Sequence, residues 1–522
     1  MFKQQKLVTD KKQATILWKK YPVYKKAVSV YLINIGKMKK LLIPFLVLFT
    51  LTASAQSTDR SAIISKVENS LAPDNIFGDS IPKLNILKQM AVYGVNGVSV
   101  AVIKDYKIDW AKGYGFADVA EKRSVTVNTR FQAASISKSL NSLALLKLVQ
   151  QGKIKPDADI NDYLKSWKFP YDSLSGNKKI SLANLLSHSA GLNVHGFGGY
   201  TPGDSLPTIL QILNGKRPAN SPAIRSEFEA SKKFQYSGGG TTISQLMLTD
   251  ITGIKYESFL KKEVLDPIGM TNSFFNQPPP AGTNELATAY YGSNEVKGKY
   301  HVYPEQAAAG LWTTPTDLAK YIIETQLELE GKSSKVLNKQ MMTKRLTPYV
   351  DSNVALGVFI MNKGAKYFNH NGGNEGFLSS YYGSFAGGDG VVVMVNSDNF
   401  NIIPEIINSV AQVYGWKGFY NPVIKKTISI SKDTLLSYTG SYLLMKDTIS
   451  IDICNDDQTR LCAKQNNQPA NGFKLIPTAD HEFSLQEVPG LLVKILFDKD
   501  GKADALEINQ TGQKLRAPRM KL

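Results

Sequence analysis

The stretch from Phe131 to Gln150 constrains the fold more than any other part of the chain. It begins as a loop and continues from Ser135 into a run that is dense in leucine and free of proline until Pro156. Apolar residues at this spacing predict a helix with a wide apolar stripe. Ser135 and Lys138 are three residues apart and therefore share one face of the predicted helix.

This pair could form a nucleophile and its base. A serine hydroxyl is a poor nucleophile until a base takes its proton, and a lysine can be that base when its ammonium is desolvated. A helix N-terminus also offers free backbone N–H groups, so the Ser135 N–H could hold an oxyanion. The spacing alone is weak evidence, because the same pattern recurs at Ser80/Lys83, Ser175/Lys178, Ser258/Lys261 and Ser429/Lys432.

The N-terminal part of the chain resembles an export signal. From Met38, two lysines precede an apolar run, Leu41 to Leu51, and Ala53-Ser54-Ala55 follows. This order predicts a secretory signal peptide over residues 38–55 and a periplasmic or secreted protein. An uncleaved amphipathic anchor is the alternative. We interpret residues 1–37 as an upstream overshoot, with Met38 as the true start.

The chain of 522 residues has a formal net charge of +18, and residues 1–55 supply +10 of it through eleven lysines and one aspartate. The remainder is mildly basic, without an arginine-rich run, so we expect no nucleic-acid partner, although anionic surface polymers fit the charge. Cys454 and Cys462 could bridge a hairpin or remain two isolated thiols. No metal-binding motif is present, and we expect neither a metal nor a cofactor.

Strand patterns at both ends of the main domain indicate one sheet around a helical region. We expect strands at 97–103, 108–115, 354–361, 367–371, 379–385 and 391–396, and a helix over about 402–414. Short β runs from 427 onward predict a small antiparallel domain, barrel-like or sandwich-like. The expected domains are 56–416 and 427–522, joined by a linker at 417–426. The predicted fold class is α+β, with an antiparallel sheet flanked by helices and an additional all-β domain.

Several further residues could have either a catalytic or a structural role. Gly238-Gly239-Gly240 follow Tyr236-Ser237 and predict an open turn before a helix over 242–251. Tyr236 on such a turn could point its hydroxyl into a cleft, or be an ordinary half-buried tyrosine. His188 could be catalytic, but its place at a helix end favours a structural role. Thr314 or Thr316 is expected to cap a helix.

Three stretches stand together in order: Ser135-Ile136-Ser137-Lys138, Tyr236-Ser237-Gly238 and His370-Asn371-Gly372. With these motifs, residues 60–415 resemble the serine β-lactamase and DD-peptidase superfamily, in its class C β-lactamase-like branch. That branch includes D-aminopeptidases, DD-carboxypeptidases and family VIII esterases. The C-terminal region resembles the small lipocalin-like domain often attached to such hydrolases, through Tyr438-Thr439-Gly440-Ser441-Tyr442.

The resemblance implies a role for each motif residue. Ser135 would attack a carbonyl and become acylated, and Lys138 and Tyr236 would move the protons, in roles that remain open between them. The backbone N–H groups of Ser135 and Gly373 would form the oxyanion hole. The small Gly372 and Gly373 would let a substrate lie along the strand edge. His370 would line the cleft and supply a donor or a partial positive charge.

Two departures from the resemblance affect the expected substrate. Gly238 stands where class C β-lactamases have Asn, and His370 stands where they have Lys. A histidine is a weaker carboxylate anchor at neutral pH than a lysine. We therefore expect an exported serine hydrolase that cleaves a small ester or a peptide, including peptidoglycan-derived ones, with weak or no β-lactamase activity. The alternative is a non-catalytic binder or sensor of cell-wall or β-lactam ligands on the same fold.

Overall fold

The computed structural model describes residues 60–455, 457–465, 473–485, 488, 490–510 and 513–520. The predicted signal peptide and the upstream segment 1–37 lie outside these residues. The chain separates into two compact units, Met1–Lys66 and Val67–Leu522, and the elements below belong to the second. Within the described ranges, no helix is both long and apolar enough to cross a membrane.

The main sheet has seven strands in the described part of the chain, in the order β4-β3-β2-β12-β11-β10-β9. All neighbours run antiparallel. The strands are β2 (Gly97–Lys104), β3 (Lys107–Asp118), β4 (Arg123–Ser124), β9 (Phe359–Lys363), β10 (Ala365–Asn374), β11 (Phe377–Ser384) and β12 (Gly390–Val395). The pairing of β2 with β12 confirms the prediction that both ends of the main domain build one sheet.

One predicted strand boundary is wrong. Residues 354–358 were expected to begin the strand that ends at Met361, but β9 starts only at Phe359. The earlier residues form a tight turn, in which Gly357 has a φ of +82° and the Ala355 N–H donates to Val358 O. A left-handed residue interrupts the extended backbone, and an alternation of apolar residues does not reveal this.

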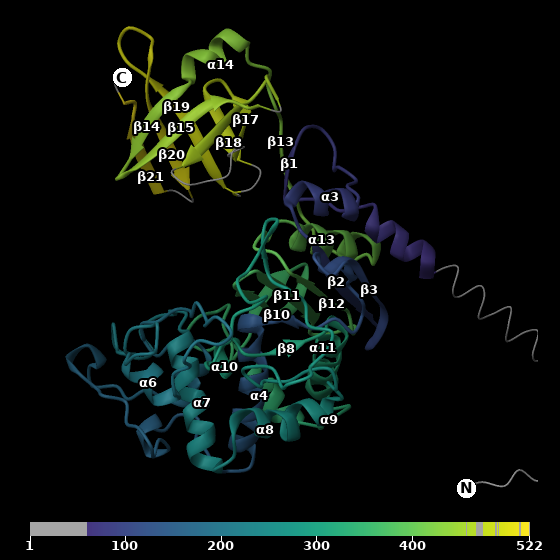
Figure 1. Ribbon diagram of the computed structural model, residues 1–522, viewed down its shortest axis with the longest axis vertical. Helices are drawn as coiled ribbons and strands as arrows, with labels where there is room; N and C mark the ends of the chain where they lie inside the picture. The colour runs from purple at the N-terminus through teal and green to yellow at the C-terminus, as the bar shows by residue number, and fades with distance from the viewer. Residues whose placement is uncertain are drawn as a thin grey trace, which may run out of the picture. The chain divides into compact units, whose positions relative to one another are not determined.

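Helices cover both faces of the sheet. Strand β12 alternates between them: Val392 and Met394 belong to the large core shared with α4 (Ser137–Gln150) and α11 (Pro315–Glu330). The other face of β12 carries α13 (Ile402–Val413), which contacts α3 (Ile86–Tyr93) in turn (Figure 1). Side chains in a strand point to alternate faces, so a strand covered on both sides is apolar throughout, as β12 is.

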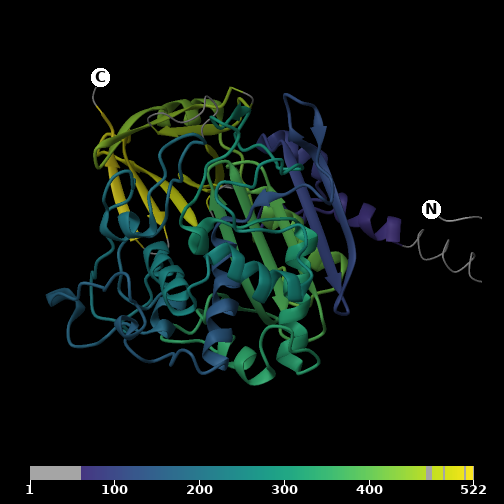
Figure 2. The same cartoon turned by 60° about the horizontal axis from the view of Figure 1, so that its bottom comes forward.

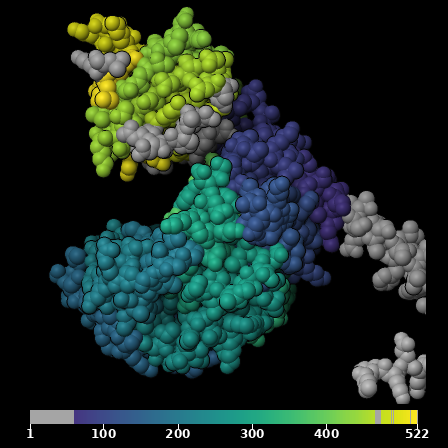
Figure 3. Space-filling model, in the orientation of Figure 1, coloured from purple at the N-terminus to yellow at the C-terminus, as the bar shows by residue number. Residues whose placement is uncertain are grey.

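The helical region lies between β5 (Phe131–Gln132) and β8 (Trp312–Thr313), which pair with each other. Its helices are α5 (Leu182–Leu186), α6 (Ile209–Asn214), α7 (Gly238–Thr252), α8 (Tyr256–Leu260), α9 (Asp266–Ile268) and α10 (Gln306–Ala309). Helices drawn in blue and teal lie in front of the green strands of the sheet (Figure 2), and this region forms a continuous surface of its own (Figure 3). After β8, Thr314 caps α11 by accepting from the Asp317 N–H, which confirms one of the two predicted caps.

The open turn predicted at Gly238–Gly240 is wrong, because these glycines form the first turn of α7. Ser237 caps the helix, and its Oγ accepts from the Gly240 N–H at 2.9 Å. Close packing replaces the flexibility of glycine: a Cβ on Gly239 would lie 3.0 Å from Ile224, and one on Gly238 would lie 3.0 Å from Phe197. Capping and tertiary packing therefore override a low helix propensity.

The C-terminal residues form an antiparallel sheet of eight strands within the described ranges, ordered as in the sequence from β14 to β21. The strands are β14 (Gly440–Leu444), β15 (Asp447–Ile453), β16 (Leu461–Gln465), β17 (Phe473–Ala479), β18 (Glu482–Leu485), β19 (Leu491–Phe497), β20 (Ala503–Gln510) and β21 (Gln513–Pro518). A bridge between Tyr442 and Arg519 brings the two edges together, which confirms the barrel-like prediction. Part of the expected linker, Val423–Lys425, forms β13, which pairs with β1 (Asn75–Phe77).

Cys454 and Cys462 form a disulfide across the turn between β15 and β16. Of the two alternatives from the sequence, the hairpin bridge is therefore confirmed. Cys462 pairs with Asp452 across the ladder, and Cys454 follows the end of β15, where its N–H donates to Arg460 O. Disulfides of this kind persist in oxidising compartments, which is consistent with the predicted export.

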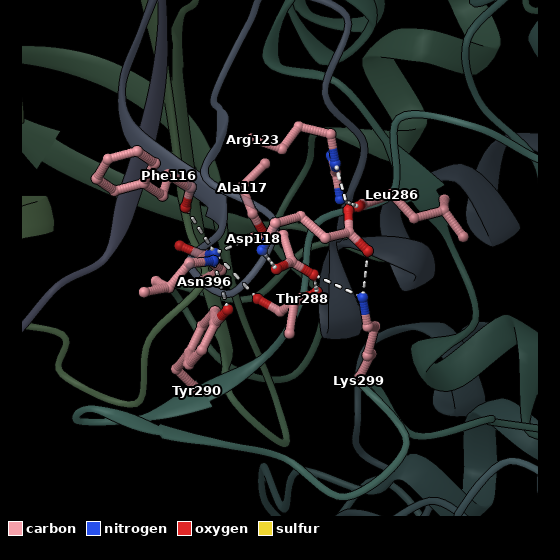
Figure 4. A network of polar contacts seen from close by, with 11 residues as sticks. Phe116, Ala117, Asp118, Arg123, Leu286, Thr288, Tyr290, Lys299 and Asn396 are labelled. Atoms are coloured by element: carbon pink, nitrogen blue, oxygen red, sulfur yellow. Dashed lines mark hydrogen bonds and ion pairs between the residues drawn. The ribbon is translucent and has the colours of Figure 1, made fainter.

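A polar network ties the end of β3 to the segment that leads toward α10 (Figure 4). Asp118 is fully buried and accepts from Thr288 Oγ1 and Lys299 Nζ, both at 2.7 Å. The Asn396 amide, at the end of β12, donates to Phe116 O and Thr288 O. Burial by itself would raise the pKa of Asp118, but the hydrogen bonds from Lys299, the Glu121 N–H and Thr288 lower it to about 2.

Replacement of Asp118 by Asn is therefore expected to destabilise the fold by about 2 kcal/mol at neutral pH, because one pKa unit corresponds to about 1.4 kcal/mol. The folded pKa lies below the ordinary value of 3.8, so this contribution is complete above about pH 4 and is lost as the pH falls through about 2. Denaturant unfolding of wild type and Asp118→Asn at several pH values measures the difference. Glu121→Gln is the matched control, since that exposed carboxylate contacts the same lysine; an equal loss in both variants contradicts the assignment.

Candidate active site

Ser135 lies in a short 3₁₀ turn, Ala134–Ile136, directly before α4. The preceding Ala134 has a φ of +49°, which is unfavourable for a residue with a side chain. Ser137 holds this backbone, because its Oγ donates to Ala134 O at 2.6 Å and accepts from the Leu311 N–H at 3.0 Å. The turn is thus fixed from both sides, and it leaves Ser135 partly exposed.

Lys138 is only 4% exposed and points back toward Ser135. Its Nζ donates to Ser135 Oγ at 3.0 Å and to the Ala308 carbonyl of α10 at 2.8 Å. A buried ammonium needs such partners, because desolvation without hydrogen bonds is costly. The arrangement puts an amine within proton-transfer distance of a serine hydroxyl, as the sequence predicts for this pair.

Tyr236 follows a loop and precedes the Ser237 cap of α7. Its ring centroid lies 5.0 Å from Lys138 Nζ. The ring lies against His188, with the two centroids 4.3 Å apart and the planes tilted by 35°, and it is nearly parallel to the Phe359 ring, whose centroid lies 6.5 Å away. The tyrosine therefore approaches the serine–lysine pair with its ring held between aromatic neighbours, an environment more constrained than that of a surface tyrosine.

His370 lies on β10 and is 2% exposed. Its Nδ1 lies 2.6 Å from Asn371 O, so Nδ1 carries the proton and donates it. Burial and the charge of Lys138 lower the pKa of His370 to about 3. Of the two expected contributions, a donor or a partial positive charge, this environment favours a neutral imidazole, in which Nδ1 is the donor and Nε2 is a buried acceptor with no hydrogen-bond partner among the described residues.

Gly372 and Gly373 follow His370 on the same strand, with different surroundings. A Cβ on Gly372 would lie 2.1 Å from Ala133 O and 2.5 Å from Ser379 Oγ. Only glycine therefore lets β10 approach the Ser135 turn this closely. A Cβ on Gly373 would meet nothing nearer than Leu378 at 3.3 Å. Gly373 is exposed toward the cleft, where a backbone N–H could reach a substrate.

These positions meet at one cleft of about 770 Å³. Ser135, Tyr236, His370, Gly372 and Gly373 all line it, while Lys138 lies beneath and is connected through Ser135. The rest of the wall is neutral and consists of amide and apolar side chains: Asn353, Asn362, Asn369, Asn371, Phe359, Ile360, Met361, Leu378 and Phe400.

Sequence reasoning missed several residues that shape the cleft. Phe359, Ile360 and Met361 come from β9, which carries no polar motif that could mark them. The Ala308 carbonyl, which holds Lys138, has no side-chain signal at all. His188 was considered, and its structural interpretation agrees with its position, but its contact with Tyr236 depends on how two distant segments pack.

The fold and the cleft bring the hydroxyl of Ser135, at the start of a buried helix, into contact with the buried amine of Lys138. The beta-lactamase family model matches residues 84–403, which is more than half of the chain, and the chain belongs to this family.

Several proteins of known name or structure are similar to it. Protein flp of Staphylococcus aureus (strain MRSA252) is 24% identical over 324 residues, which cover 60% of this chain and 62% of the relative. The octameric penicillin-binding protein homologue from Pyrococcus abyssi has a TM-score of 0.57 at 20% identity, over 83% of this chain and 98% of that structure. The D-amino acid amidase of Ochrobactrum anthropi SV3 has a TM-score of 0.54 at 18% identity, over 68% of this chain and 99% of that structure. At these identities the two structures support the fold.

The contrast between the two glycines can be tested by stability. Gly372→Ala is expected to lower the melting temperature by several degrees, because its Cβ would overlap the Ala133 carbonyl and force the strand away from the Ser135 turn. Gly373→Ala is the matched control, because its Cβ would meet only the end of the Leu378 side chain, at 3.3 Å, which can shift slightly; its melting temperature should stay within about one degree of wild type. Thermal unfolding of both variants measures the difference in melting temperature. Equal melting temperatures would contradict the close approach of Gly372 to the Ala133 carbonyl.

Proposed function

We propose that the chain hydrolyses a small ester or amide through an acyl-enzyme on Ser135. The observation that supports this most strongly is the contact of Lys138 Nζ with Ser135 Oγ at 3.0 Å, at the floor of an open cleft. In the reaction, Ser135 Oγ forms a bond to the substrate carbonyl carbon as its proton passes to Lys138 or Tyr236, and the group that accepts it must begin without its own proton, as a neutral amine or as a phenolate. The same pair then protonates the leaving group as the bond to the carbonyl breaks.

Hydrolysis of the acyl-enzyme reverses these steps with water. A water molecule in the cleft gives a proton to the Lys138–Tyr236 pair and attacks the ester carbonyl, and Ser135 Oγ leaves with a proton. The backbone N–H groups of Ser135 and Gly373 would hold the oxyanion in both halves, and each such donor is typically worth about 3–4 kcal/mol. His370, being neutral, would contribute an acceptor at Nε2 and no charge.

The cleft favours neutral substrates over β-lactams. The neutral His370 supplies no cation for a carboxylate, and Gly238 supplies no side-chain amide. The wall of asparagine and apolar side chains suits an uncharged acyl or leaving group. The similar amidase acts on D-amino acid amides according to its name, which keeps a D-amino-acid peptide among the candidate substrates alongside esters.

We propose in addition that the protein acts in the periplasm or outside the cell. The signal-like segment from Met38 and the disulfide between Cys454 and Cys462 support export. A non-catalytic binder is the second candidate, supported by the similar penicillin-binding protein homologue. The Lys138 contact with Ser135 argues against it, because a binder does not need a buried amine at its serine.

Ser135→Ala is expected to lower kcat for a short p-nitrophenyl ester by at least about a thousandfold, because the nucleophile is lost. Ser258→Ala provides the matched control, since Ser258 and Lys261 repeat the same spacing on an exposed part of α8. Steady-state kinetics and the intact mass after treatment with a fluorophosphonate test both variants. If Ser135→Ala keeps more than about a tenth of the wild-type kcat, or still takes up the phosphonate, Ser135 is not the nucleophile.

Short p-nitrophenyl esters are expected to be hydrolysed with a higher kcat/KM than nitrocefin, by roughly tenfold or more, because the site provides no carboxylate anchor. Side-by-side kinetics on the purified protein measure the ratio. The double variant Gly238→Asn with His370→Lys introduces the missing amide and ammonium groups, and it should lower the ratio of kcat/KM for the ester to kcat/KM for nitrocefin. A higher kcat/KM for nitrocefin than for p-nitrophenyl acetate in the wild type contradicts the preference.

A further inference from the structure

We propose that His188 is a positioning residue that holds the Tyr236 ring against Lys138 during proton transfer. This inference rests on the proposed role of Tyr236. His188 lies 48 positions before Tyr236 in the sequence and does not line the cleft. It acts from behind the tyrosine.

His188 contacts three consecutive residues centred on Tyr236. Its backbone carbonyl accepts from the Gln235 N–H at 2.7 Å, on one side of the tyrosine. Its Nδ1 accepts from the Ser237 N–H at 3.2 Å, on the other side. Between these two hydrogen bonds, the imidazole stacks on the Tyr236 ring at 4.3 Å, with 35° between the planes. One residue thereby fixes both the backbone and the ring plane of the tyrosine.

The turn that carries His188 is held independently of Tyr236. Asn184 Nδ2 donates to Ser189 Oγ and to Ser231 Oγ, and the Ser189 N–H donates to Asn184 O. Ser187 Oγ donates to Ala183 O at 2.7 Å. His188 itself has a φ of +54°, a left-handed conformation that is unfavourable for most side chains and is kept here by these contacts. The imidazole is therefore a preformed support.

The hydrogen bonding of the imidazole fixes its protonation state. Nδ1 accepts from a backbone N–H, so Nδ1 carries no proton and the ring proton is on Nε2. Burial, and then the charge of Lys138, hold the pKa of His188 well below its ordinary value. The support is thus neutral. The neutral imidazole adds no positive charge near Lys138. The Nζ atom of Lys138 lies 5.0 Å from the centroid of the Tyr236 ring.

Phe359 completes the surroundings of the ring. It is nearly parallel to Tyr236, at 16°, and its own ring lies 5.2 Å from His370. The Tyr236 ring therefore has two aromatic neighbours, His188 and Phe359, that limit its tilt. Proton transfer depends steeply on such placement, because a shift of about 1 Å at a catalytic group can cost about a hundredfold in rate.

A role in positioning and a role in folding alone make different predictions. If His188 only stabilises the fold, its replacement lowers the melting temperature and leaves kcat for the folded enzyme unchanged. If it positions Tyr236, its replacement lowers kcat with little change in KM. The loss then disappears once the tyrosine hydroxyl is absent, because there is nothing left to position.

The test is a double-mutant cycle on the full chain with one p-nitrophenyl ester, using His188→Leu in the wild type and in Tyr236→Phe. We expect His188→Leu to lower kcat of the wild type by about tenfold to a hundredfold, with KM within about threefold. When His188→Leu is added to Tyr236→Phe, kcat of the double variant should fall less than about threefold below that of Tyr236→Phe alone. His188→Asn keeps an acceptor and tolerates a positive φ, so it should recover part of kcat. It also carries the cycle if His188→Leu does not fold.

Ile160→Val is the control for a general loss of stability, because Ile160 is buried in the same core and belongs to a different turn. It should lower the melting temperature and leave kcat within about twofold of wild type. If the loss of kcat in the double variant equals the product of the losses in His188→Leu and Tyr236→Phe, the two residues act independently. That result would overturn the positioning role and leave the proposed function intact. A near-normal kcat in Tyr236→Phe would overturn the role of the tyrosine itself and, with it, this inference.

Discussion

The buried contact between Lys138 and Ser135 is the interaction on which the rest of the site depends. An ammonium that is 4% exposed is tolerated only with hydrogen-bond partners, and one of these is the Ala308 carbonyl. That carbonyl is placed by α10, which follows the segment anchored through Lys299 and Asp118. The position of Lys138 Nζ is thus set by two segments that are far apart in the sequence: the start of α4, which carries Lys138 itself, and α10, which carries the Ala308 carbonyl.

The turn that carries Ser135 and the strand that faces it, β10, are joined by close backbone packing. The left-handed φ of Ala134 and the absence of a side chain at Gly372 belong to the same contact, in which Ala133 O meets β10. Strain at a turn of this kind persists only where the surrounding structure fixes it, as Ser137 does here. The geometry of the cleft follows from this packing as much as from its polar residues.

Aromatic and neutral groups then define the chemistry around the charged pair. His188 and Phe359 lie beside the Tyr236 ring, and His370, whose pKa is lowered by burial, presents a neutral imidazole. Lys138 lies at the serine, and the cleft wall around it is neutral. An amine in such surroundings is suited to exchange protons with a serine and less suited to bind an anion.

The sequence by itself determined the strands at both ends of the main domain, the helix after Ser135 and the motif residues of the cleft, Ser135, Tyr236, His370, Gly372 and Gly373. These follow from local periodicity and from motifs whose chemistry depends on residue type. Tertiary structure alone decided the helical start at Gly238, the late beginning of β9, the neutral state of His370 and the contact of His188 with Tyr236. Each depends on burial or on the packing of distant segments, which no local pattern records: desolvation sets the charge of an imidazole, and close packing selects the backbone at a glycine.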